Sequence, residues 1–255
     1  MTTFLALFRL EIVLAKRLAP LRIVMALLPI VMMIFLANAV EFLVHLDGYL
    51  RSNGTEHGIA GLSVLFCFVN LPFLSWSTYD EHGFGTWDRL RSSHVPPSLI
   101  LASKVAFMTM YLIFMFGVSY LGGLLLDMDI KGSLGAWALI ALMISFTASC
   151  YGIMLYVLLP TANLFVILSH AGCLLMGGFA GCLVPFRLLP GWVQNIAPAL
   201  PQYWATRAFR EVSLDGLGLG AVVSELAILG CFSLLFLVVA AWRFDPSASK
   251  RPLSE

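Results

Sequence analysis

Long apolar stretches recur along the chain, separated by short polar connections. Six of them reach the roughly 20 residues that an α-helix needs to cross the hydrocarbon core of a bilayer. They are residues 21–44, 59–78, 99–126, 134–159, 163–184 and 217–242. The pattern predicts an all-α integral membrane protein with six transmembrane helices, folded as one transmembrane domain over residues 1–255.

Residues 1–20 precede the first apolar stretch and have a different pattern. Phe4, Leu7, Phe8 and Leu14 can share one helical face, whereas Arg9, Glu11, Lys16 and Arg17 fall elsewhere. This amphipathic pattern favours a helix that lies in the cytoplasmic interface of the membrane. The alternative is a simple extension of the first span.

Residues 185–216, between the fifth and sixth spans, contain four prolines and are too polar to cross a membrane. Trp192, Tyr203 and Trp204 suit the headgroup level of a bilayer. The segment is therefore expected to form one or two short re-entrant helices in the outer leaflet. Arg207 and Glu211 are four residues apart and can pair on one helical face.

Composition agrees with this class of protein, because 60% of the residues are hydrophobic and only 11% are charged. The formal net charge is +1, which offers no basic surface for nucleic acid. Basic residues concentrate in the N-terminal segment, in the connection between the second and third spans, and in the C-terminal tail. Since basic loops stay inside, we expect a multi-pass protein of the plasma (inner) membrane with both termini cytoplasmic.

The connection at residues 80–98 carries the most informative pattern. Thr86 can cap a short helix, and Trp87, Leu90 and Arg91 then fall on one side of it. Pro96 and Pro97 end that helix. An amphipathic helix on a cytoplasmic connection can offer an apolar anchor and a charged rim to a soluble partner, although a plain solvated connector has the same composition.

This connection resembles the corresponding loop of ABC-2 type permeases, whose pattern is roughly E-x-E-x-G-T-hydrophobic-E-R-L with a later Pro and Lys. The matching positions are Glu81, Gly85, Thr86, Trp87, Asp88, Arg89, Leu90, Pro96 and Lys104, and the second acidic position is Gly83 instead. The segment from Pro185 to Val212 is similar to the one that follows the fifth span in drug and lipo-oligosaccharide exporters of the same family.

The resemblance implies the membrane-spanning subunit of an ATP-driven exporter that moves an amphipathic substrate, such as a drug, lipid or glycolipid. It implies an ABC ATP-binding subunit and a second permease subunit as partners, within membrane lipid. Coupling to the ATPase would fall on the eight residues Glu81, Gly85, Thr86, Trp87, Asp88, Arg89, Leu90 and Arg91. Trp87 and Leu90 are expected to supply the apolar anchor that a partner buries, and Glu81, Arg89 and Arg91 its charged rim. No G-x-x-x-x-G-K-[ST] loop occurs in the sequence, so ATP and magnesium are expected on the partner and no cofactor on this chain.

Other chemistry has little support in the sequence. The five histidines show no metal-ligand spacing, and no G-x-S-x-G motif is present. Polar residues within the apolar stretches, namely Asn38, Asn70, His170 and Glu225, either line a translocation path or subunit interface, or make ordinary interhelical hydrogen bonds. An intramembrane enzyme and a secondary carrier are the alternative functions.

Overall fold

The computed structural model describes residues 2–17, 19–92, 95–245 and 250–251, and those residues fold almost entirely into helices. No β-strand occurs among them, only one isolated bridge between Thr161 and Arg251. The α-helices are α1 (Thr2–Arg17), α2 (Ala19–Leu46), α3 (Thr55–Val69), α4 (Leu71–Gly83), α5 (Thr86–Ser92), α6 (Pro97–Leu125), α7 (Leu134–Leu158), α8 (Ala162–Phe179), α9 (Gly191–Ile196), α10 (Pro201–Ser213) and α11 (Val223–Arg243). Single 3₁₀ turns are η1 (Phe186–Leu188), η2 (Ala197–Ala199) and η3 (Leu219–Ala221).

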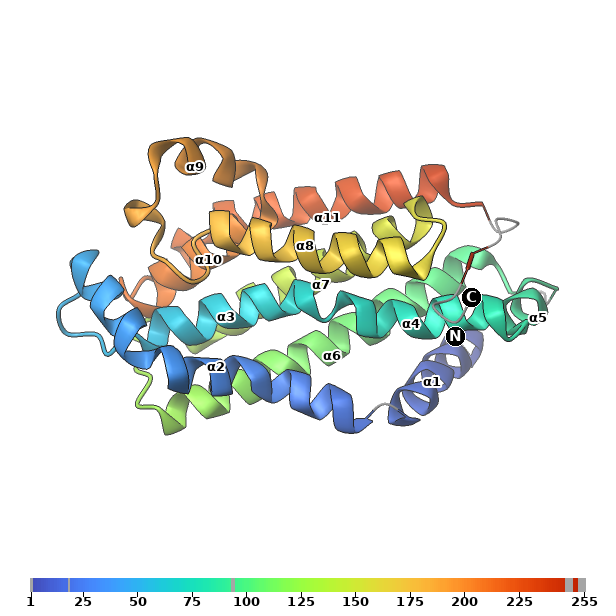
Figure 1. Cartoon of the computed structure of the whole chain (residues 1–255), viewed down its shortest axis with the longest axis horizontal. Helices are drawn as coiled ribbons and strands as arrows, with labels where there is room; N and C mark the ends of the chain where they lie inside the picture. The colour runs from blue at the N-terminus through green and yellow to red at the C-terminus, as the bar shows by residue number, and fades with distance from the viewer. Residues whose placement is uncertain (1, 18, 93–94, 246–249, 252–255) are drawn as a thin grey trace.

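The long helices lie side by side along one axis, and the bundle has two distinct ends (Figure 1). One end, called here the terminal end, carries α1, α5 and both ends of the chain. The other, called the distal end, carries residues 47–54, 126–133 and 180–222. Both ends of the chain therefore lie at the same end of the bundle, and the cytoplasmic orientation of that end stays a prediction.

Five helices are long and apolar enough to cross a membrane: α2, most of α6, α7, α8 and α11. The second expected span, residues 59–78, is instead divided into α3 and α4 at Asn70. Pro72 explains the division, because its nitrogen has no hydrogen to donate to the carbonyl one turn earlier. The Asn70 side chain donates to the Phe66 carbonyl at 2.7 Å, which also accepts the Asn70 backbone N–H at 3.0 Å, and Tyr111 of α6 donates to Asn70 Oδ1 at 3.0 Å.

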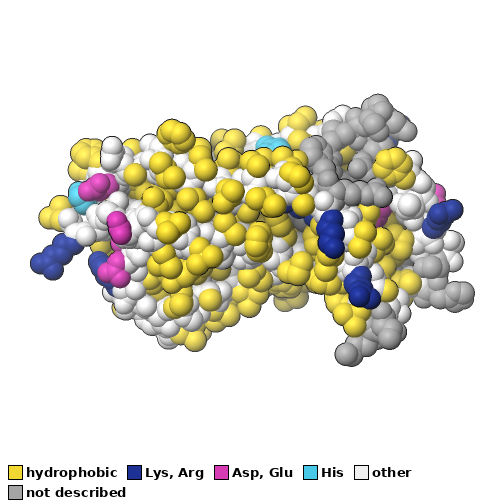
Figure 2. Space-filling model, turned by 90° about the horizontal axis from the view of Figure 1, so that it is seen from below, with side chains coloured by type: hydrophobic (Ala, Val, Ile, Leu, Met, Phe, Trp, Pro, Cys, Tyr) yellow, Lys and Arg dark blue, Asp and Glu magenta, His cyan; other side chains and the backbone are white. Residues whose placement is uncertain are grey.

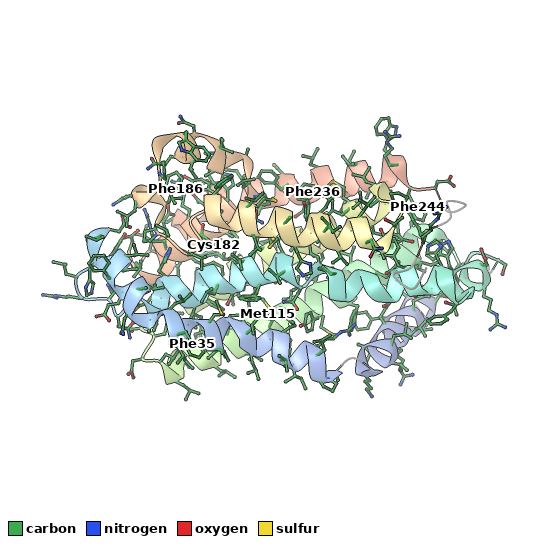
Figure 3. The ribbon with its side chains drawn as sticks, viewed as in Figure 1. Phe35, Met115, Cys182, Phe186, Phe236 and Phe244 are labelled. Carbon is green, nitrogen blue, oxygen red and sulfur yellow. The ribbon has the colours of Figure 1, made fainter. Side chains whose placement is uncertain are left out.

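The core of the bundle contains α7, which packs against α6 and α11, and α3, whose residues 55–68 are all buried. Phe116, Trp137 and Phe209 form an aromatic cluster with ring centroids 5.2 to 6.0 Å apart. Met115 lies in the middle of the molecule and is fully buried, whereas Phe35 projects from the outer side of α2 (Figure 3).

The outer surface of the bundle carries many large apolar side chains. Only 22% of the most apolar part of α2 is buried within the chain, and 28% of that of α11. On the face shown in Figure 2, charged side chains gather toward the two ends and leave an apolar band between them. A soluble protein does not expose such a continuous apolar area, so the band suits the hydrocarbon of a bilayer.

Both segments expected to lie outside the spans form helices of their own. α1 runs in a different direction from α2, and Leu7 on its apolar side is buried (Figure 1). Residues 185–216 contain α9 and α10, and Arg207 pairs with Glu211 at 3.0 Å as predicted. α10 packs against α3, α7 and α11, so this helix belongs to the core of the distal end.

Candidate coupling site

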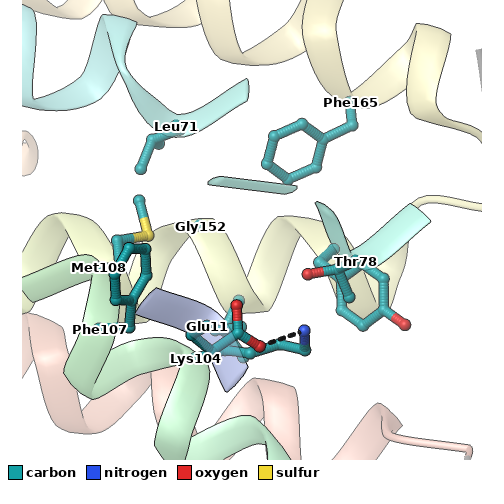
Figure 4. Close-up of a pocket in the computed structure, with 10 residues that line it drawn as sticks. Glu11, Leu71, Thr78, Lys104, Phe107, Met108, Gly152 and Phe165 are labelled. Atoms are coloured by element: carbon teal, nitrogen blue, oxygen red, sulfur yellow. Dashed lines mark hydrogen bonds and ion pairs between the residues drawn. The ribbon is translucent and has the colours of Figure 1, made fainter. Parts of the chain in front are cut away.

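Three charged side chains from three helices meet at the terminal end. The Lys104 ammonium of α6 donates to Glu11 Oε1 of α1 at 2.7 Å and to Glu81 Oε1 of α4 at 2.9 Å. Each of the three side chains is only 6–7% exposed. We call Glu11, Glu81 and Lys104 the charged triad; Figure 4 shows its Glu11–Lys104 bond.

Burial makes the triad a strong constraint on these helices. A buried charge is tolerated only when partners with good geometry offset its lost hydration, and removing one partner leaves the others uncompensated. Burial raises the pKa of Glu81 above its ordinary value, although the Lys104 charge opposes this. Beside the triad lies a cavity of about 20 Å³, lined by Glu11, Lys104 and Thr78 among others, which is large enough for one water molecule.

α5 is joined to the same end of the bundle through Trp87. The indole is 4% exposed and belongs to a cluster with Leu7 of α1 and Ile100 of α6. It also stacks on the His82 ring with centroids 4.8 Å apart and meets Phe244, which follows α11, edge-on at 6.5 Å. One side chain of α5 therefore contacts four other parts of the chain.

His82 extends this contact toward α7. Its Nε2 lies 2.8 Å from the Tyr156 hydroxyl. Burial, together with the charge of Lys250, lowers the pKa of His82 to about 4. The imidazole is therefore neutral at physiological pH, and it stacks on Trp87 as an aromatic ring without a positive charge.

The C-terminal tail is attached to the same end. Lys250 Nζ donates to the carbonyls of Val157 and Leu159, at 2.9 and 2.8 Å. The backbone of Arg251 bonds to Pro160 and Ala162. The tail thus holds the connection between α7 and α8.

The structure changes three details of the predicted coupling segment. Trp87 was expected to face a partner but is buried within the chain, and Glu81 was expected on an exposed rim but is buried against Lys104. Thr86 does not cap α5 from outside: it is the first residue of the helix, and its hydroxyl donates to the Glu81 carbonyl at 3.2 Å. Gly85, with φ of +67°, makes the turn that precedes it.

The solvent-facing side of the segment consists of other residues. Thr86, Asp88 and Arg89 are exposed, and Leu90 is half-buried. Phe84, just before the helix, is 81% exposed and supplies the only large apolar side chain that the described part of this segment presents outward. The side chain of Arg91 lies outside the described residues.

The four polar residues expected to mark a path or interface do not converge. Asn38 is exposed on α2, and Asn70 sits fully buried at the break between α3 and α4. His170 bonds through Nδ1 to the Val166 carbonyl of its own helix at 3.1 Å. Glu225 is 2% exposed and pairs with Arg207 at 3.3 Å at the distal end.

Two features of the site could not be found by sequence pattern alone. Glu11 was placed on the polar side of α1, yet it is buried, because Lys104 of α6 lies opposite it. Arg22 was counted only as a basic residue that orients the chain, yet it is 7% exposed. Lys104 and Arg22 both lie inside apolar stretches of the sequence, where a charged side chain usually has a partner or a functional role. That position is the sequence feature that could have indicated their burial.

An apolar helical bundle with charged side chains gathered at its two ends defines a multi-pass membrane protein. The family model of the ABC-2 type transporter matches residues 2–214, and the chain belongs to that family. Members of this family are the membrane subunits of ABC transporters, not catalytic subunits, and the family implies an ABC ATP-binding subunit as partner. No curated protein and no solved structure matches the chain.

Proposed function

We propose that this chain is the permease subunit of an ATP-driven exporter, which moves an amphipathic substrate outward across the plasma membrane. Two copies, or this chain and a related permease, form the membrane unit, and the substrate crosses where they meet. A separate ABC subunit on the cytoplasmic side binds ATP and magnesium. α3 and α4 together make the second of six crossings, so that both termini are cytoplasmic and residues 185–216 lie in the outer leaflet.

The observation that carries this proposal is the joining of α5 to the spans. Trp87 ties α5 to α1, α4, α6 and the end of α11, and the charged triad ties α1, α4 and α6 to one another. A displacement of α5 by a partner would therefore move several helices together. A solvated connector has no need of either feature.

The docking surface of this proposal consists of Phe84, Asp88 and Arg89, with Trp87 as an internal anchor. Arg91 stays part of it on the sequence pattern alone. Phe84 provides the apolar knob and the charged residues provide the rim, the usual division of a protein interface. Glu81, Gly85 and Leu90 support that surface from beneath, and the exposed Thr86 holds the start of α5 through its bond to the Glu81 carbonyl. Truncation of a central apolar anchor costs more binding energy than removal of a rim charge.

The test compares Phe84→Ala and Arg89→Ala with wild type, by co-purification of the ATP-binding subunit from native membranes and by substrate-stimulated ATP turnover. We expect Phe84→Ala to weaken association about tenfold or more, which corresponds to roughly 1.4 kcal/mol, and Arg89→Ala to weaken it less. Thermal stability of the isolated chain should not change in either variant, since both side chains are exposed.

The matched control is Phe35→Ala, which removes the same side chain from an 82% exposed position on α2, away from α5 (Figure 3). Loss of the ATPase in Phe84→Ala but not in Phe35→Ala supports the proposed surface. Wild-type association and turnover in the double variant Phe84→Ala with Arg89→Ala would refute it. Transport driven by an ion gradient without any ATPase would favour a secondary carrier. Chemical turnover of a substrate by the chain alone would favour an intramembrane enzyme.

A further inference from the structure

A groove of about 640 Å³ opens at the terminal end where α1, α2 and α6 meet. α1 contributes Ile12, Ala15 and Lys16 to its lining, and α2 contributes Ala19, Arg22 and Ile23. The remaining wall consists of four large side chains of α6, namely Phe107, Met110, Tyr111 and Phe114. The groove is thus almost wholly apolar, with two positively charged side chains in its lining.

Arg22 is the unusual residue of this groove. It is 7% exposed, and its Nε and Nη1 atoms find no hydrogen-bond acceptor among the described residues. The guanidinium lies over the rings of Phe107 and Tyr111, 5.3 and 6.0 Å from their centroids. Cation–π contacts offset part of the lost hydration but leave the Nε and Nη1 nitrogens without an acceptor.

The carboxylate that could pair with Arg22 is already engaged. Glu11 of α1 is close enough for its charge to act on Arg22. Its Oε1 atom, however, accepts from Lys104 at 2.7 Å. No ion pair between Arg22 and a carboxylate occurs among the described residues, so the guanidinium is a buried donor without an anion in the lining of an apolar groove.

The groove has a polar end and an apolar end. Lys16 belongs to α1, the amphipathic helix at the terminal end, and Arg22 to the first turns of α2; the lipid headgroups of that leaflet are expected there. From there Met110 and Phe114 continue the wall along α6 toward the middle of the bundle, 43% and 55% exposed. A ligand that fits has an anionic group at one end and a hydrocarbon chain at the other.

We propose that this groove holds an anionic phospholipid, with its phosphate on Arg22 and Lys16 and one acyl chain against Phe107, Met110 and Phe114. Phosphate oxygens match the paired donors of a guanidinium, and basic pockets between membrane helices bind acidic headgroups. The lipid is a structural ligand that fixes α1 to α2 and α6, and it need not be the transported substrate.

Charge complementarity favours a lipid over a second copy of this chain as the occupant. A second copy that packed its apolar helices over the groove would have to bring a carboxylate to Arg22. Among the described residues of the helices α2, α6, α7, α8 and α11, only Glu41 and Glu225 carry a carboxylate. Glu41 lies toward the distal end of α2, and Glu225 pairs there with Arg207.

The test uses the full chain, purified in a neutral detergent and freed of lipid. Dioleoyl-phosphatidylglycerol, dioleoyl-phosphatidylcholine or glycerol 3-phosphate is added, and Tm and the lipid retained in native mass spectrometry are measured. We expect phosphatidylglycerol to raise Tm by roughly 5–10 °C at a hundredfold excess over Kd, with at least tenfold preference over phosphatidylcholine. Glycerol 3-phosphate alone should have no effect at the same concentration.

Arg22→Gln should abolish the preference for phosphatidylglycerol, and its lipid-free Tm should equal or exceed that of wild type, because an unpaired buried charge is removed. Arg22→Lys should keep part of the preference. The matched control, Arg9→Gln, removes an exposed charge from α1 and should bind like wild type. Phe114→Ala should weaken binding of the long-chain lipid.

Three results would overturn the proposal. Equal effects of the two phospholipids would leave only a non-specific apolar groove. A Tm increase with glycerol 3-phosphate would make the ligand a free anion. Dissociation of a dimer in Arg22→Gln, whatever the lipid, would assign the groove to a second copy of the chain.

Discussion

Replacing Lys104 by Met should be among the most destabilising single changes at the terminal end. The ammonium holds Glu11 and Glu81 at 2.7 and 2.9 Å, and all three side chains are 6–7% exposed. Methionine keeps the length of the side chain but leaves two buried carboxylates without a counter-charge. Breaking a buried ion pair in this way costs about 3–5 kcal/mol.

That cost corresponds to a fall in Tm of roughly 6–20 °C, at 2–4 °C per kcal/mol for a chain of this size. The loss should be reversed in large part by combining Lys104→Met with Glu11→Gln and Glu81→Gln, which removes all three charges and keeps hydrogen-bonding groups. Thermal unfolding of the purified chain in neutral detergent, followed by intrinsic fluorescence, measures both effects.

Lys131→Met is the matched control, because it removes one positive charge from an exposed position at the distal end. Its Tm should lie within about 2 °C of wild type, since exposed charges contribute little. A Lys104→Met variant as stable as Lys131→Met would show that the triad is hydrated and does not join α1, α4 and α6. A triple variant as unstable as the single one would show that packing of the lysine chain, not charge, is what matters.

Two further predictions concern backbone approach and the start of α5. Gly61→Ala should destabilise the chain by several kcal/mol, because a Cβ there would overlap the carbonyl oxygen of Cys182. In the control Gly117→Ala the new Cβ meets no atom within 4 Å, so this variant should gain up to about 1 kcal/mol in helix stability. Similar Tm values for the two variants would contradict the close approach of Gly61 to Cys182. Thr86→Ser should keep the hydrogen bond to the Glu81 carbonyl and have a Tm near that of wild type. Thr86→Val should lower the free energy of unfolding by about 1 kcal/mol. Equal Tm values for the two variants would show that this hydrogen bond does not stabilise the chain.

The positions of the long helices could be predicted from the sequence because each bilayer span needs a long apolar run, and such a run is visible without knowledge of its neighbours. The division of the second span could not be placed as easily. Pro72 sits near the middle of a run that is otherwise apolar, and only the bond from Tyr111 of α6 shows that Asn70 stabilises a break there.

The coupling segment was located correctly as a short helix, but its inward and outward sides were reversed in part. Spacing alone places Trp87 and Leu90 on one face, yet it does not say whether that face meets a partner or the chain's own helices. Leu7, Ile100 and Phe244 decide this by enclosing the indole, and they lie far apart in the sequence. The role of the segment in binding an ATPase stays a prediction.

Three parts of the chain, namely α1 with α2, α3 with α4, and α6, are joined to one another at two places along the bundle. These two sets of contacts are the structural basis of the coupling proposal. At the terminal end the charged triad joins α1, α4 and α6. Further along, the Tyr111 hydroxyl of α6 lies 3.1 Å from the Arg22 carbonyl of α2 and 3.0 Å from Asn70 Oδ1. Because one set of links is ionic and buried, α4 cannot shift at its α5 end without α1 and α6 following. The break at Asn70 is then the place where such a shift can be absorbed, since the helical hydrogen bonding of α3 and α4 is already interrupted there.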